Sequence, residues 1–185
     1  MEMQNARQLA ITQQQAWDML NDTAVLQTCI PGCESIKAAG DNTYALVNAV
    51  KIGPMAVRFK GVITLSDMQV PSAYTLNFEG NGGVSGFGKG SARITLKPQS
   101  VGCEMSYTVR ATASGKIAQI GQRLIDSAVK SMTERFFKRF DKEIKRRYPP
   151  PGNEDAANEQ EPGKFKQIWP RLTGGGQPPQ PPAQG

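Results

Sequence analysis

The chain has 185 residues, three cysteines, no histidine and a formal net charge of +6. The absence of histidine excludes Ser-His and Cys-His dyads and most catalytic zinc sites, because imidazole supplies the base or the ligand in each. No run of about 18 apolar residues predicts a transmembrane helix, and the N-terminus lacks the pattern of a secretory signal. We therefore expect a cytoplasmic protein with reduced thiols.

The first part of the chain predicts one strand followed by two short helices. Residues 4–11 form the strand, and Thr12 begins a helix with a glutamine three residues on, which is the capping-box spacing. Asn21 or Asp22 caps the second helix, which ends at the CIPGCES segment (29–35), where a Pro-Gly pair predicts a turn. Helices this short are not stable alone, so they must pack on another element.

Apolar and polar side chains then alternate in several runs between residues 44 and 111. Period-two alternation with short turns is typical of antiparallel strands that have one covered face, and we expect about six of them after the helices. The alternating apolar positions include Tyr44, Leu46, Val50, Ile52, Met55, Val57, Phe59, Ile63, Leu65, Tyr74, Leu76, Phe78, Ile94, Leu96, Cys103, Met105, Tyr107, Val109 and Ala111.

A glycine-rich segment, GNGGVSGFGKGSA (80–92), has part of the spacing of a phosphate-binding loop. Gly90, however, stands where such a loop needs a magnesium-binding Ser or Thr. The segment also joins two predicted antiparallel strands and does not precede a helix. We interpret it as a strand edge whose missing side chains leave room for a ligand or partner, with Phe87 as the bulky side chain at that opening.

The three thiols do not form a recognisable site. Cys29 and Cys33 lack the C-x-x-C redox spacing, and with Cys103 as the remaining thiol no soft four-ligand metal site is complete. The carboxylates of the chain show no pairing by spacing. The sequence thus predicts neither a metal centre nor an acid/base couple, and we interpret the cysteines as packing residues.

The segment from Ser114 to Tyr148 predicts one long amphipathic helix that ends before Pro149. Its outer face is strongly basic, with ten basic and four acidic residues between positions 116 and 147. We expect the last basic turns, 142–147, to project from the domain and to attract an anionic membrane or an acidic partner. Nucleic acid is not expected, because no aromatic residues interleave with these charges.

Residues 149–185 are rich in Pro, Gly and Gln and predict a solvated tail after a domain at 1–148. Within the tail, a basic and apolar cluster at 164–172 has two open interpretations: a short anchor at a membrane interface, or a segment that packs back on its own domain. The cluster consists of Lys164, Phe165, Lys166, Ile168, Trp169, Arg171 and Leu172.

The order of elements predicts an α+β fold. One strand, two short helices, a series of antiparallel strands and a long final helix are best satisfied by a curved sheet wrapped around that helix, since each apolar face needs the other.

Four segments also carry a family resemblance: CIPGCES (29–35), KIGPMAVRFKGVITLSD (51–67), the YTLNFEGNGG and GFGKGSA run (74–92) and SGKIAQIGQRLID (114–126). In this order they resemble the G subunit of carbon monoxide dehydrogenase, a family of the START-like (SRPBCC) helix-grip superfamily, over about residues 3–148. The resemblance implies a non-catalytic accessory protein of a molybdenum hydroxylase, typically carbon monoxide dehydrogenase, that recruits the enzyme to the inner face of the cytoplasmic membrane. It also implies a lipophilic ligand held between sheet and helix.

We therefore expect a protein without covalent cofactor or metal that binds a lipophilic molecule, a respiratory quinone, and associates peripherally with the membrane. The expected cavity residues are Phe59, Phe78, Phe87, Met105, Tyr107, Ile120, Leu124 and Met132. The alternative is a scaffold without cargo that serves membrane recruitment or assembly of the enzyme. An enzyme of the cyclase or hydrolase type is a third interpretation, and it lacks an identifiable acid/base pair.

Overall fold

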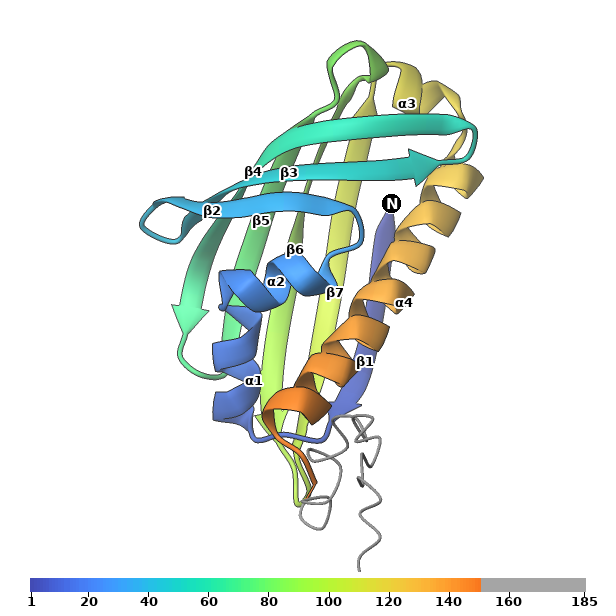
Figure 1. Cartoon of the computed structure of the whole chain (residues 1–185). Coiled ribbons are helices and arrows are strands. Elements are labelled where there is room, and N and C mark those ends of the chain that lie inside the picture. Colours follow the sequence, from blue (N-terminus) through green and yellow to red (C-terminus); the bar gives the residue numbers. More distant parts are fainter. Residues whose placement is uncertain (151–185) are drawn as a thin grey trace, which may run out of the picture. The chain divides into compact units, whose positions relative to one another are not determined.

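A computed structural model describes residues 1–150 of the chain. They form a seven-stranded antiparallel sheet with the order β1-β7-β6-β5-β4-β3-β2, which curves so that β2, β3 and β4 cross over one end of it (Figure 1). The sequence prediction of one strand followed by six is confirmed. The strands are β1 (Glu2–Leu9), β2 (Cys33–Gly40), β3 (Thr43–Ile52), β4 (Met55–Gln69), β5 (Ala73–Asn81), β6 (Phe87–Pro98) and β7 (Cys103–Ser114).

Two short helices, α1 (Gln13–Leu20) and α2 (Thr23–Cys29), follow β1 and begin at the predicted caps. The Thr12 hydroxyl accepts from the backbone of Gln15, and the Gln15 side chain accepts from the backbone of Thr12, so the capping box is complete. The Asp22 carboxylate accepts from the backbone N–H groups of Ala24 and Val25 at the start of α2. Both helices lie against the concave face of the sheet (Figure 1).

The segment predicted as one helix forms two, α3 (Lys116–Gln119) and α4 (Gln122–Arg147). Gly121 separates them with φ of +95°, a conformation that glycine adopts without the clash that a Cβ would create. The prediction of a single helix from Lys116 was therefore wrong. The apolar periodicity continues past Gly121, but the backbone conformation of Gly121 ends one helix and begins another. Among residues 1–150, no helix is both long and apolar enough to cross a membrane.

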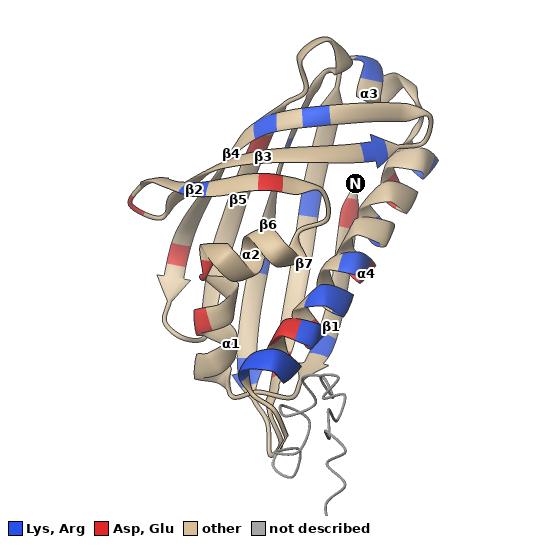
Figure 2. Cartoon of the chain, viewed as in Figure 1, with Lys and Arg blue, Asp and Glu red and all other residues tan. Residues whose placement is uncertain are grey.

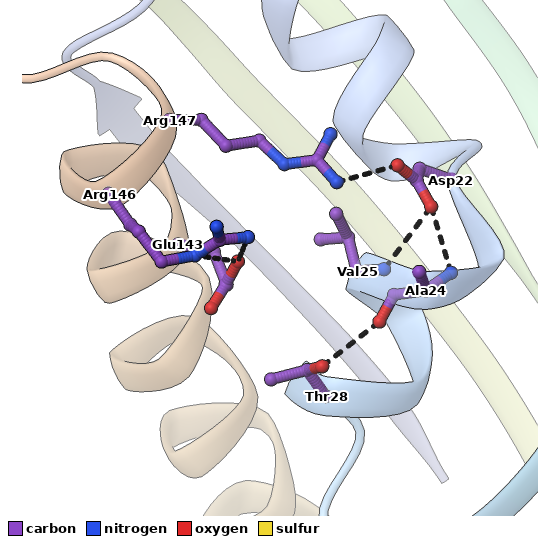
Figure 3. Close-up of polar contacts among 7 residues, drawn as sticks. All are labelled: Asp22, Ala24, Val25, Thr28, Glu143, Arg146 and Arg147. Carbon is purple, nitrogen blue, oxygen red and sulfur yellow. Dashed lines mark hydrogen bonds and ion pairs between the residues drawn. The ribbon is translucent and has the colours of Figure 1, made fainter.

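The expectation of a projecting basic end at 142–147 is also wrong. Ile144 is buried, and the Arg147 guanidinium lies 2.7 Å from the Asp22 carboxylate at the start of α2 (Figure 3). The apolar stripe of α4 continues to this last turn through Phe137 and Phe140, so the helix is held where its charge is highest. The opposite end is looser: Leu124, in the first turn, is 42% exposed.

Two clusters of apolar side chains fill the concave side. The larger one joins α1, α2 and the last turns of α4 to the sheet, with Trp17 edge-on to Tyr74 at 5.4 Å. The smaller one lies where β3 turns into β4 and contains Ile52, Val57 and Ile117. The core is therefore continuous at the α1–α2 end and thinner at the α3 end.

The glycine-rich segment joins β5 to β6 through a short 3-10 turn, η1 (Gly83–Ser85), as the sequence predicts for two antiparallel strands. No helix follows it, so the structural context of a phosphate loop is missing. The membrane-contact residues predicted at 164–172, together with the rest of 151–185, lie outside the described residues.

Candidate functional site

The main candidate site is an apolar cavity of about 290 Å³ between the concave face of the sheet, the two short helices and the middle of α4. Its sheet side consists of inward side chains from several strands, and its roof comes from α2 and α4. The lining residues are Met3, Leu20, Asn21, Leu26, Ile30, Pro31, Ile36, Tyr44, Ile63, Leu65, Tyr74, Leu76, Ala92, Ile94, Met105, Tyr107, Val109, Met132, Thr133, Phe136 and Phe137.

The structure places three of the eight predicted cavity residues on this wall. Met105 and Tyr107 are neighbouring inward positions of β7, and Met132 faces them from α4. The Tyr107 ring stacks on Phe137 with the ring centres 5.5 Å apart, so sheet and helix meet directly at one edge of the cavity.

Phe59 and Phe78 point to the concave side but do not line the cavity. Their rings occupy the space that the glycines leave open. A Cβ at Gly90 would lie 2.7 Å from Cζ of Phe78, and one at Gly80 would lie 3.4 Å from the Phe59 ring. The room that we expected for a ligand in the glycine-rich segment is thus filled by the protein's own aromatic side chains.

The other three predicted residues, Phe87, Leu124 and Ile120, also lie outside the cavity, because the strand register and the helix break turn their side chains elsewhere. Phe87 falls on the same side of β6 as Lys89 and lines a groove on the outer face of the sheet. The break at Gly121 places Leu124 over the β3–β4 turn, where its methyl carbon would lie 3.1 Å from a Cβ at Gly53. Ile120 packs in the smaller cluster.

Polar groups are few on the cavity wall, and they are neutral. Burial raises the pKa of the Tyr74 and Tyr107 hydroxyls, so both are neutral and able to donate hydrogen bonds, although the Arg7 charge and the Asn5 side chain partly oppose the rise at Tyr107. Thr133 adds a hydroxyl from α4. Such a wall favours an apolar ligand selected by shape, with polar recognition confined to a few points.

One buried polar atom near the cavity lacks a partner among the described residues. Asn48, on β3, is 8% exposed, and its side-chain oxygen accepts no hydrogen bond there. Asn48 on β3 is the cross-strand partner of Phe59 on β4, and the pair lies between the two apolar clusters. No signal in the sequence indicated it, because a single asparagine within a strand is common.

The thiols do not form a reactive centre. All three are free, and burial raises the pKa of Cys29 to about 11 and raises those of Cys33 and Cys103. Protonated, buried thiols behave as small apolar side chains, which agrees with the packing role expected from the sequence. Within residues 1–150, no group of three or more potential ligands could hold a metal ion.

Sequence reasoning missed the contribution of the two short helices and of β1. Leu20, Leu26 and Ile30 close one side of the cavity, and Met3 contributes from the edge strand. The apolar periodicity of the helices indicated burial but not which cavity they would cover. The polar residues that accompany Met3 on the concave side of β1 could be found only from the register with β7.

A curved sheet that holds a long helix over an apolar cavity defines a START-like, helix-grip protein. A START superfamily protein from Mycobacterium smegmatis has this fold, with a TM-score of 0.60, 8% identity and coverage of 78% of this chain and 97% of that one. An aromatase/cyclase from a Streptomyces species is similar at a TM-score of 0.59 and 11% identity, covering 82% and 98%. At these identities the likeness concerns the fold alone.

Residues 6–145 match the family described as the G subunit of carbon monoxide dehydrogenase (CoxG). The chain belongs to this family. A conserved protein from Geobacillus kaustophilus is 30% identical, with a TM-score of 0.74 and coverage of 79% of this chain and 96% of that one. The search of curated proteins found no match to this sequence.

Proposed function

We propose that this protein is a non-catalytic accessory protein that binds a lipophilic molecule, a respiratory quinone, in the cavity between sheet and helix. In this role it links a molybdenum hydroxylase of the carbon monoxide dehydrogenase type to the cytoplasmic membrane. Membership of the CoxG family supports the enzyme partner. The observation that supports a lipophilic ligand is the apolar cavity itself.

The cavity limits the size of what it encloses. Its volume of about 290 Å³ lies at the lower end of the roughly 300–1,000 Å³ that is usual for ligand pockets. A complete respiratory quinone is larger than this. The cavity therefore encloses a ring or a short length of tail, and the rest of the ligand extends beyond it.

Native mass spectrometry of the full-length protein after incubation with 2-decyl-1,4-benzoquinone tests the ligand. We expect one bound molecule per chain. Met132→Trp fills the cavity from α4 and should abolish binding, whereas Leu124→Trp, on the same helix but away from the cavity, should leave it unchanged. A wild-type protein that stays empty when offered the quinone would refute the ligand-binding role.

The second candidate, a scaffold without cargo, is favoured by a row of exposed basic side chains along α4 (Figure 2). Arg135, Lys138, Lys142 and Lys145 are spaced by three or four residues, so they share one side of the helix, turned away from the buried stripe. A protein that binds anionic vesicles through this row and takes up no quinone would be such a scaffold.

A further inference from the structure

The concave face of the sheet is largely apolar, and besides Asn48 of β3 its polar side chains include two on the edge strand β1. Asn5 and Arg7 of β1 pair in register with Tyr107 and Met105 of β7. Cross-strand partners in a sheet share a face, so Asn5 and Arg7 point to the same side as two residues of the cavity wall. Arg7 therefore places a cation at the rim between sheet and helix, where its side chain is 37% exposed.

These residues line a second hollow, a cleft of about 410 Å³ between β1 and α4. The two elements lie side by side in Figure 1. Cleft and cavity share four lining residues, which form the boundary between an apolar space and a polar one: Met3, Tyr107, Thr133 and Phe137. The stacked rings of Tyr107 and Phe137 lie on this boundary, so a ligand that occupies both spaces must pass beside them.

Arg7 is half-buried at this boundary, and its hydrogen-bonding capacity is unused. Its guanidinium carbon lies 4.5 Å above the centre of the Phe137 ring, and the nearest carboxylate, that of Asp141, is 3.7 Å away, beyond hydrogen-bond distance. Among residues 1–150, no acceptor is hydrogen-bonded to any of its five N–H donors. The ring below and the carboxylate beside it hold the guanidinium in place while leaving these donors free.

We propose that the cleft between β1 and α4 holds the oxygen-bearing head group of the ligand, with Arg7 and the Tyr107 hydroxyl as donors and the apolar tail in the cavity. This assignment rests on the proposed lipophilic-ligand function. It names the part of the ligand that the protein recognises by polar contacts, and it gives Arg7 a role as a binding residue.

The charge of the cleft selects a neutral head over an acidic one. Its lining includes three carboxylates, those of Glu2, Asp126 and Glu134, against three cations, those of Arg7, Lys130 and the N-terminal ammonium of Met1. A carboxylate head would therefore enter a site without excess positive charge. The carbonyl oxygen of a quinone is uncharged, so it can accept a hydrogen bond from Arg7 without bringing a further negative charge next to the cleft carboxylates.

The test compares two probes with the same carbon skeleton, 2-decyl-1,4-benzoquinone and decylbenzene, of which only the quinone carries carbonyl oxygens on its ring. Their affinities for full-length protein are measured by displacement of the neutral dye N-phenyl-1-naphthylamine, whose own affinity is determined for every variant. Decanoate serves as the probe with an acidic head. The variants are Arg7→Gln and Tyr107→Phe, with Arg58→Gln as a matched control that breaks an exposed ion pair to Glu34, away from both the cleft and the cavity.

We expect Arg7→Gln to weaken the quinone about tenfold, as for loss of a hydrogen bond to a charged group, and Tyr107→Phe to weaken it about threefold. Decylbenzene should bind all variants alike, Arg58→Gln should match the wild type, and decanoate should bind more weakly than the quinone. Equal losses for quinone and decylbenzene in Arg7→Gln would overturn the head-group site and leave Arg7 a structural role. If neither probe binds the wild type, the ligand-binding function itself fails, and this assignment fails with it.

Discussion

Gly90 is the position where the packing of the concave face can be tested most sharply. A Cβ there would lie 2.2 Å from the carbonyl oxygen of Arg110 on β7 and 2.7 Å from Cζ of Phe78. The first contact is with backbone, which a side-chain rotation does not relieve, so β6 and β7 must separate. Gly88 lies two residues earlier on the same face, and the nearest atom to a Cβ there is 4.0 Å away.

Gly90→Ala should therefore destabilise the fold by about 1–3 kcal/mol, the usual cost of overpacking. Gly88→Ala should be neutral or stabilising by up to about 1 kcal/mol, because alanine reduces the freedom of the unfolded chain. Urea unfolding followed by far-UV circular dichroism yields both values. If the two variants unfold at the same urea concentration, the glycine-rich segment is not shaped by Phe78 and the close approach of β7.

Two further predictions concern α4. Asp22→Asn keeps the cap of α2 but removes the ion pair with Arg147, and should cost about 0.2–1 kcal/mol at pH 7. The Arg147 hydrogen bond lowers the pKa of Asp22, so this stabilisation is present above the unfolded value of about 3.9 and is lost as the pH falls through the folded value. Urea midpoints of wild type and variant should converge in acid, and a gap that persists at pH 2 would contradict the ion pair. Replacing Lys138, Lys142 and Lys145 by Gln should reduce co-sedimentation with anionic vesicles, since about 1 kcal/mol per cation is expected near such a surface. Raised salt should reproduce the effect on the wild type, and unchanged binding of the triple variant would exclude this row as the membrane contact.

Much of the fold could be predicted from the sequence because its signals are local. Alternation marks the strands, and the capping residues Thr12 and Asp22 mark where the short helices begin. The break at Gly121 was missed because the spacing of apolar side chains contains no information about the backbone conformation of a glycine between them. The anchoring of the last turns of α4 was missed because one unbroken helix from Lys116 would be too long for a small core to cover, which favours projection of its end, although Ile144 continues the buried stripe to the last turn.

The site could be predicted only in part, since its residues are brought together by register. Met105 and Tyr107 alternate inward along one strand, so their place on the concave side follows from the sequence. Phe87 also lies near apolar neighbours in sequence, but it is one residue out of phase with the inward set of β6. Arg7 carried no signal as a binding residue, because its position opposite Met105 exists only once β1 pairs with β7.

The cavity lies where it does because one inward row across the sheet has a small side chain, Ala92, at its centre. In the register of β5, β6 and β7, Leu76 faces Ala92 and Ala92 faces Val109, and all three line the cavity. The adjacent row toward η1 has glycine at its centre, yet it is closed, because the Phe78 ring lies over Gly90. A glycine on the concave face therefore leaves a cavity only where no long side chain from a neighbouring strand fills the space above it. Ala92 is just beyond the aromatic ring that fills the glycine row, and its single methyl group leaves the volume that the ligand is proposed to occupy.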